Sequence, residues 1–319
     1  MRRRLSATII AGAFLLPNFL GFVIFTFGPV VFSLAASFTN WNLMKTVPLQ
    51  WVGLDNFLKL MQSPDFHRYF VNTAYLMLGL PVAIAGSLLL AVILSQPLRG
   101  VVVYRTLFYL PSFTSGVALF ILWKALYNPE FGPINQVLET LFDWAGLTSV
   151  KAPTWLTSTQ NPLALAVEYA GFSPDQFGLG ARDAIIIMGI WTAVGGGNLL
   201  LYLAGISNIP QDLYEAAEMD GAGACSKFRH VTWPQLAPTT FFIVVMSFIG
   251  GLQGGFEQAR VMTLGGPAGT TTTLSYYIYV KAFEEFQIGY ASAIAWILFI
   301  IIFAVTLLNW RFGSRYVNY

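Results

Sequence analysis

The sequence contains little charge, since lysine, arginine, aspartate and glutamate make up 10% of its 319 residues, against about 25% in an average soluble domain. Six windows contain no charged residue and are mainly apolar, and a seventh, 261–280, is rich in Thr and Gly and is expected to be a loop. Each of the six can hold about 20 apolar residues, the length that a helix needs to cross roughly 30 Å of hydrocarbon. This composition excludes an ordinary soluble domain and predicts an integral membrane protein. The predicted spans are approximately 9–37, 70–95, 104–126, 184–206, 236–257 and 287–310.

The sequence also contains few cysteines and histidines, and its net charge is small. The one cysteine, Cys225, cannot form an internal disulfide. The two histidines, His67 and His230, lie far apart without the spacing of metal ligands, so we expect no metal site. A net charge of +2 excludes a polybasic nucleic-acid reader. The spans contain no paired carboxylates and no Ser/His/Asp set, so we expect no catalytic residue.

The pattern of spans predicts an all-α, polytopic helix bundle over 1–319 as a single membrane domain. Six crossings put both termini on one side of the membrane, together with the loop 207–235. With Arg105, which lies just inside its span, the segments on that side carry nine of the 17 lysines and arginines in about half the length of the opposite loops. The positive-inside rule therefore predicts a cytoplasmic location for both termini and for 207–235, and an extracytoplasmic location for 127–183. The apolar stretch after Arg4 is too long for a signal peptide, so we expect a retained first span.

The loop 207–235 is the most polar segment between the apolar spans. Its carboxylates recur at helical spacing, and Gly221 can end a helix in the left-handed conformation. The pattern predicts two short helices, about 211–220 and 224–232, joined at this glycine. A membrane chain with one compact amphipathic element presents that element to an aqueous partner. The carboxylates are Asp212, Glu215, Glu218 and Asp220.

This loop resembles the EAA loop of ABC importer permeases of the carbohydrate-uptake type. The family pattern is Glu-Ala-Ala, three residues, Gly, nine residues, and an apolar-x-apolar-Pro ending. Segments 263–267 and 289–293 resemble the same branch. The departures are Val231 and Trp233, where the family more often has Ile and Leu. The resemblance implies that the loop carries a cytoplasmic coupling helix whose ATPase-coupling residues are Glu215, Ala216, Ala217, Asp220, Gly221 and Pro234.

The resemblance also implies the partners of the chain. Family members pair with a second homologous permease, two ATPase subunits and an extracytoplasmic solute-binding protein in the bacterial cytoplasmic (inner) membrane. This sequence has no Gly-x-x-x-x-Gly-Lys-Ser/Thr loop, because its only lysine before Ser or Thr is Lys45. We therefore expect no cofactor on this chain, and ATP with Mg in the partner ATPase subunits. The outer loop is longer than is typical of the family, by about 20 residues near 165–182. This extension could alter the surface on which the binding protein docks or add contacts to it.

Polar and aromatic side chains within the spans are candidates for a substrate path, because polar groups in a membrane tend to face a cavity or a neighbouring helix. Amides and hydroxyls could bind sugar hydroxyls, and aromatic rings could stack on sugar faces. For each residue, an interhelical contact remains the alternative. The candidates are Asn72, Tyr75, Trp191, Asn198, Gln253, Phe256, Ser292 and Trp296.

The expected function is the permease subunit of an ATP-driven, binding-protein-dependent importer that works by alternating access on a sugar or oligosaccharide. The alternative is a secondary transporter or channel that works alone. Such proteins usually have charged residues within the membrane for ion coupling, and these spans are nearly free of charge. The sequence does not identify the solute, although the scarcity of cations disfavours a strongly anionic cargo.

Overall fold

The computed structural model describes residues 2–44, 47–114, 116–147, 150–162 and 177–313. These residues are mostly helical and include no strand, which confirms the all-α fold class. The predicted extension near 165–182 lies largely outside the described residues. The chain divides into unit 1, Met1–Phe66 with Tyr277–Phe299, and unit 2, His67–Tyr276 with Ile300–Tyr319. The assignment of 1–319 to one domain stays a prediction.

Four helical segments are long and apolar enough to cross a membrane, namely Gly12–Ser37, Pro64–Leu94, Ala181–Ser207 and Ile288–Arg311. Two further pairs of helices meet the same criteria but are bent by more than 40°. They are Val101–Phe113 with Gly116–Leu126, and Ala224–Gln235 with Ala237–Gln253. If each bent pair is one span, the described residues contain six candidates.

Unit 1 begins with one long apolar helical run, α1 (Arg2–Phe22), the π-helical turn η1 (Val23–Phe27) and α2 (Gly28–Ser37). It continues with α3 (Asp55–Gln62) and the start of α4 (Pro64–Leu76). The C-terminal part of unit 1 contains the end of α16 (Leu274–Tyr279), the π-helical turn η8 (Val280–Glu284) and the first half of α17 (Ile288–Gly313). The run Gly12–Ser37 is almost entirely exposed.

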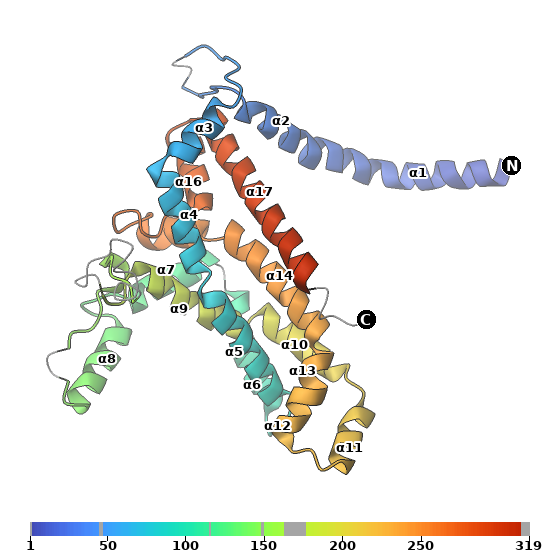
Figure 1. Ribbon diagram of the computed structural model, residues 1–319, viewed down its shortest axis with the longest axis vertical. Coiled ribbons are helices and arrows are strands. Elements are labelled where there is room, and N and C mark those ends of the chain that lie inside the picture. Colours follow the sequence, from blue (N-terminus) through green and yellow to red (C-terminus); the bar gives the residue numbers. More distant parts are fainter. Residues whose placement is uncertain (1, 45–46, 115, 148–149, 163–176, 314–319) are drawn as a thin grey trace. The chain divides into compact units, whose positions relative to one another are not determined.

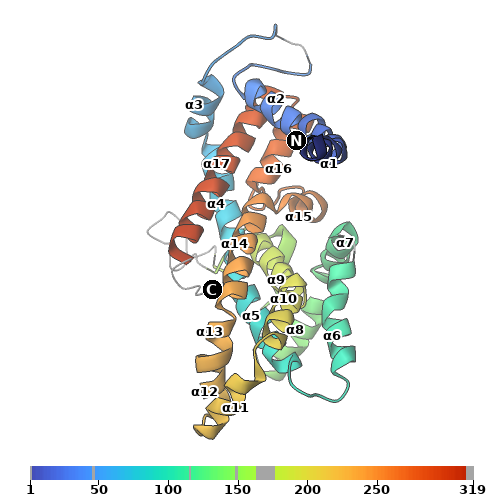
Figure 2. The same cartoon turned by 90° about the vertical axis from the view of Figure 1, so that its right-hand side faces the viewer.

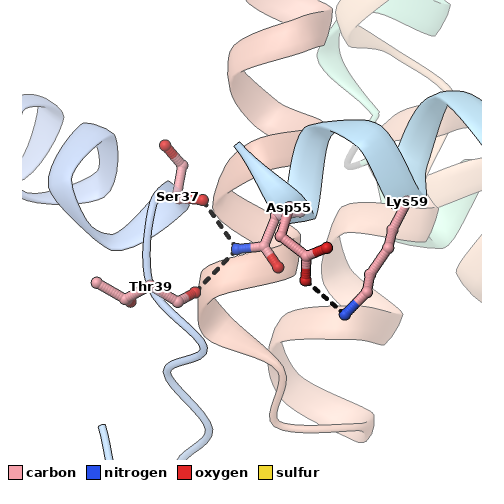
Figure 3. Close-up of polar contacts among 5 residues, drawn as sticks. Ser37, Thr39, Asp55 and Lys59 are labelled. Atoms are coloured by element: carbon pink, nitrogen blue, oxygen red, sulfur yellow. Dashed lines mark hydrogen bonds and ion pairs between the residues drawn. The ribbon is translucent and has the colours of Figure 1, made fainter. Parts of the chain in front are cut away.

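A buried asparagine fixes the segment that follows α2. The side-chain amide of Asn56 donates to the carbonyl oxygens of Ser37 and Thr39, both at 2.8 Å. Next to it, Lys59 pairs with Asp55 at 2.6 Å along α3 (Figure 3). Because the carbonyls at the end of a helix lack partners within the helix, the amide supplies the missing donor and holds α3 against the end of α2.

Unit 2 is built around α5 (Gly79–Leu94), which packs on α9 (Ala181–Val194) and α10 (Gly197–Ser207). Two glycines allow the close approach of α5 to α9. A Cβ at Gly79 would lie 2.9 Å from Cγ2 of Ile186, and one at Gly86 would lie 2.7 Å from a methyl group of Val194. Small residues at membrane helix contacts bring backbones together in this way. A second contact joins α10 to α14 (Ala237–Gln253).

The remaining elements of unit 2 are mostly short. They are α6 (Val101–Tyr109), the 3₁₀ turn η2 (Leu110–Phe113), α7 (Gly116–Leu126), α8 (Pro133–Trp144), the 3₁₀ turn η3 (Trp155–Thr157), α15 (Phe256–Gln258) and the π-helical turn η7 (Ala259–Thr263). An aromatic core joins α7, η3 and α9. Its centre is Tyr127, which lies 5.0 Å from the ring of Trp155 and donates its hydroxyl to the carbonyl of Ala184 at 2.9 Å. Burial raises the pKa of Tyr127, so this hydroxyl stays protonated.

Candidate functional site

Two short helices lie at one end of unit 2 (Figures 1 and 2). They are α11 (Gln211–Met219) and α12 (Ala224–Lys227). We call residues 211–227 the polar hairpin. After α12, the chain continues through the π-helical turn η6 (Phe228–Thr232) and α13 (Trp233–Gln235) into α14. The second predicted helix, 224–232, is therefore part α-helix and part π-helix.

Gly221 ends α11 with a specific backbone motif. Its φ of +78° lies in the left-handed region that side chains disfavour. The N–H of Gly221 donates to the carbonyl of Glu218 at 2.9 Å, and the N–H of Ala222 donates to that of Ala217 at 2.9 Å. These two bonds form a Schellman motif, which satisfies the last carbonyls of the helix. The glycine therefore sets the angle between the two arms of the polar hairpin.

Most of the predicted coupling residues lie on the surface of this element. Ala217 is half-buried, whereas the side chains of Glu215, Ala216 and Asp220 are exposed. Pro234 is exposed in α13. Met219 is also 89% exposed, and Leu213 on the same helix is 39% exposed, so the hairpin presents large apolar side chains beside its carboxylates. Sequence reasoning did not single out Met219.

Two side-chain bonds hold the polar hairpin. The hydroxyl of Tyr214 lies 2.9 Å from Oγ1 of Thr232, which is buried in η6. At the other end, Nζ of Lys227 pairs with Oε1 of Glu218 at 2.5 Å. Behind α11 lies a cavity of about 790 Å³, which extends to Arg105 on α6. Sequence reasoning missed Tyr214 and Thr232 as partners, because hydroxyls 18 positions apart give no local signal.

Two of the substrate-path candidates make hydrogen bonds within unit 2 to residues far away in sequence. Asn72 is 2% exposed, and its amide donates to the carbonyls of Gly269 at 2.8 Å and Thr272 at 3.1 Å. The hydroxyl of Tyr75 donates to Oδ1 of Asp183 at 2.8 Å. Both side chains link α4 to segments that lie more than 100 residues away in sequence. Tyr75 thus contacts α9, whereas Asn72 contacts the turn between η7 and α16.

The other candidates are more accessible. In unit 2, Trp191 and Gln253 are exposed, whereas Asn198 and Phe256 are half-buried. The ring of Trp191 lies 5.5 Å from that of Trp123. The last two candidates belong to unit 1, where Ser292 is half-buried and Nε1 of Trp296 donates to Oγ of Ser33 at 3.2 Å.

A small cavity of about 290 Å³ lies between α5, α9 and the end of α14. Its wall includes the hydroxyl residue Ser247 and the amide residue Gln258, neither of which was a sequence candidate. Helix α14 ends here, and Gly255 has a φ of +86°, which is outside the helical region. A side chain would not fit at this position, because a Cβ would lie 2.3 Å from Cγ2 of Thr273. Irregular backbone at membrane depth occurs where it is buried in protein or lines a cavity.

Among the described residues, no group of three or more His, Cys, Asp or Glu side chains is arranged to hold a metal ion. The described part of unit 2 thus combines apolar helices, two cavities and the exposed polar hairpin. Long apolar helices beside an exposed polar element are typical of a polytopic membrane protein.

The chain belongs to the family described as the inner membrane component of binding-protein-dependent transport systems, whose model matches residues 68–317. It is 34% identical to the "Probable ABC transporter permease protein YesP" of Bacillus subtilis over 312 residues, which are 96% of this chain and 91% of that protein. It is 28% identical to the arabinooligosaccharides transport system permease protein AraP of Halalkalibacterium halodurans, over 91% of this chain and 83% of AraP.

A solved structure has the same fold. It is that of a bacterial ABC transporter involved in the import of the acidic polysaccharide alginate, with a TM-score of 0.78 and 26% identity. The match covers 99% of both chains. The chain is therefore a permease of the ABC importer class, and the family resemblance found in the sequence is confirmed.

Proposed function

We propose that this permease forms part of the membrane path of a saccharide importer, and that a separate ATPase drives it through the polar hairpin. Three features of the chain support this division of labour. The spans have almost no charge with which to couple transport to an ion gradient. The sequence has no phosphate-binding loop. The exposed polar hairpin offers a surface on which an external protein can act.

The proposed partners are a second homologous permease, two ATPase subunits that bind ATP and Mg, and an extracytoplasmic solute-binding protein. The apolar run Gly12–Ser37 is almost entirely exposed. In water such a surface would be unfavourable, so lipid and the second permease are its proposed surroundings. Both termini and the polar hairpin lie in the cytoplasm in this proposal, and residues 127–183 lie outside the bacterial inner membrane.

The single observation that carries the proposal is the geometry of the polar hairpin. Glu215 is exposed on α11 and can pair with a cation of the ATPase, while Ala216 leaves room for a close contact. Gly221 fixes the angle at which α11 is presented. Closure of the ATPase around ATP would move the hairpin, and α13 and α14 connect it directly to the membrane helices. Such a movement can switch the path between outward-open and inward-open states.

In unit 2, the substrate path is proposed to use the accessible candidates Asn198 and Gln253, and in unit 1 the hydroxyl of Ser292 is a separate candidate for contact with the solute. Their amides and hydroxyl suit the hydroxyl groups of a sugar. Asn72 and Tyr75 were candidates as well. Their hydrogen bonds to distant segments of unit 2 favour a structural contribution, so we expect substitutions there to affect stability before specificity.

The coupling role is tested in proteoliposomes that contain the complete transporter. Glu215→Arg reverses the charge on α11, so we expect the ATPase subunit to be lost on purification and ATP-dependent uptake to fall at least tenfold. The matched control is Glu139→Arg, which reverses an exposed charge on α8 and should leave both measurements unchanged. Uptake that persists without ATP or an ATPase subunit would overturn the proposal.

The orientation is tested with the native cysteine. Cys225 is the only cysteine in the sequence and is exposed in the polar hairpin. A membrane-impermeant maleimide should leave it unlabelled in intact spheroplasts and should label it in inside-out vesicles. Labelling of intact spheroplasts would place the hairpin on the outer side and contradict the proposed topology.

A further inference from the structure

Unit 1 contains an open polar cleft of about 440 Å³, which the family role described above does not use. We call it the unit 1 cleft. Its walls come from the segment after α2, from α3 and the start of α4, from α16 and η8, and from the turn before α17. The volume falls in the range of small-molecule sites, about 300–1,000 Å³. The lining residues used below are Trp41, Asn42, Lys59, Asp65, Lys281 and Gln287.

Backbone contacts give the unit 1 cleft a defined shape. The N–H of Gly289 donates to the carbonyl of Trp41, and the N–H of Leu43 donates to that of Phe286, both at 3.0 Å. Gly289 also approaches the backbone so closely that a Cβ would lie 2.1 Å from the carbonyl oxygen of Thr39. The segment after α2 is thus fixed to the turn before α17 on one side, and Asn56 fixes it to α3 on the other.

Several hydrogen-bonding groups of the cleft are unused. Among the described residues, the indole N–H of Trp41, the side-chain amide of Gln287 and the Nδ2 group of Asn42 have no partner, and all three side chains are half-buried. The hydroxyls of Tyr277 and Tyr290 interact with each other, and burial with this hydrogen bond raises the pKa of Tyr277, which keeps it uncharged. Half-buried amides beside an indole ring offer both hydrogen bonds and an apolar face to one ligand.

The charges of the cleft indicate an uncharged ligand. Lys59 is paired with Asp55 at 2.6 Å, and Lys281 is paired with Glu285 at 2.7 Å. Each pair has a net charge of zero. The remaining charged group in the described lining is Asp65, which would repel a carboxylate or a phosphate.

We propose that the unit 1 cleft binds one or two rings of a neutral saccharide. Neutral sugars are recognised by amide and hydroxyl hydrogen bonds combined with an aromatic face, and Trp41, Asn42 and Gln287 supply this set in one concave site. The inference rests on the proposed function, since it treats the saccharide cargo as the ligand. It adds a selectivity against acidic sugars such as the uronates of alginate.

The experiment uses the complete transporter in lipid nanodiscs without the binding protein. Saturation-transfer NMR is recorded with cellobiose, maltose, lactose and xylobiose as neutral probes and with digalacturonate as the acidic probe. We expect at least one neutral disaccharide to bind and digalacturonate to bind at least tenfold more weakly. Gln287→Ala should weaken the neutral interaction by about fivefold to tenfold, the effect of one lost hydrogen bond. Gln62→Ala, an exposed amide of α3 outside the cleft, is the matched control.

Trp41→Ala provides a second variant, and circular dichroism verifies that both variants are folded. Binding by none of the neutral probes, equal binding of digalacturonate, or unchanged affinity in folded Gln287→Ala would each overturn the proposal. A crosslinking experiment with Asn42→Cys tests whether the cleft contacts the binding protein instead. If this cysteine crosslinks to the binding protein and none of the disaccharides prevents the crosslink, the cleft is a protein contact and the proposal is overturned.

ATP-dependent uptake is measured in parallel. Uptake of a neutral sugar without binding at the cleft would reject this inference alone, whereas no saccharide uptake at all would reject the proposed function.

Discussion

The polar hairpin and the turn at residues 263–273, which we call the threonine turn, are both polar interruptions between apolar helices of unit 2, but they use their polar groups differently. In the threonine turn, Thr271 is fully buried, and its hydroxyl donates to the carbonyl of Gly266 at 2.7 Å. In the polar hairpin, Glu215 is exposed. Buried polar groups must be satisfied within the protein, whereas exposed ones stay available to a partner. The comparison separates a polar scaffold from a polar contact surface.

Asn72→Leu should have the largest effect, because it removes the donor to two carbonyls of the threonine turn. Each unsatisfied buried group costs about 1–3 kcal/mol, so we expect a loss of roughly 3 kcal/mol in the free energy of unfolding. Thermal and denaturant unfolding in detergent, followed by circular dichroism, measure it. The control is Asn309→Leu, because Nδ2 of Asn309 is buried without a partner in the described structure. Equal destabilisation by both variants would contradict the scaffold role.

Gly221→Val should have the next largest effect, because a side chain at φ +78° is strained by about 1–2 kcal/mol. We expect little change in the unfolding of the membrane helices and a strong loss of ATP-dependent uptake, since α11 would end at a different angle. Gly223→Val is the matched control. Both glycines have open space around them, but Gly223 has an ordinary φ of −72°. If the two variants transport equally well, the conformation of Gly221 does not matter for coupling.

The sequence predicts the exposed region better than the buried one. Charge-free windows locate the apolar helices, and Gly221 after a helical pattern predicts the end of α11, because both signals are local. The partners of Asn72 and Tyr75 could not be predicted in this way. Gly269 and Asp183 lie 197 and 108 positions away, so only the fold brings them together. The sequence therefore made Asn72 and Tyr75 candidates for the substrate path, whereas in the structure both form hydrogen bonds to distant segments of the chain.

Tyr214→Phe should have a moderate effect, because it deletes the hydroxyl that bonds to Thr232 while leaving the ring. The lost hydrogen bond should weaken the attachment of α11 to η6 by about 1 kcal/mol. We expect less solute to be transported per ATP hydrolysed, and an unchanged melting temperature. Thr232→Val should have the same effect, and the double variant should be no worse than either single one, because both remove the same bond. Tyr104→Phe, which alters an exposed ring on α6, serves as the control. Additive losses in the double variant would show that the two hydroxyls act independently.

Glu218→Gln should have the smallest effect, although its ion pair with Lys227 is the shortest described contact of the polar hairpin at 2.5 Å. The side chain of Glu218 is 62% exposed, so water and salt screen the pair, and such pairs contribute about 0.2–1 kcal/mol. We expect an unchanged melting temperature and less than a twofold change in uptake at 150 mM salt, with any difference disappearing as the salt is raised. The measurement separates the two acids of α11, since Glu215→Gln should reduce uptake at the same salt because its proposed partner lies on the ATPase. If Glu218→Gln reduced uptake as strongly as Glu215→Gln, the hairpin would depend on its internal pair, and its contrast with the threonine turn would be lost.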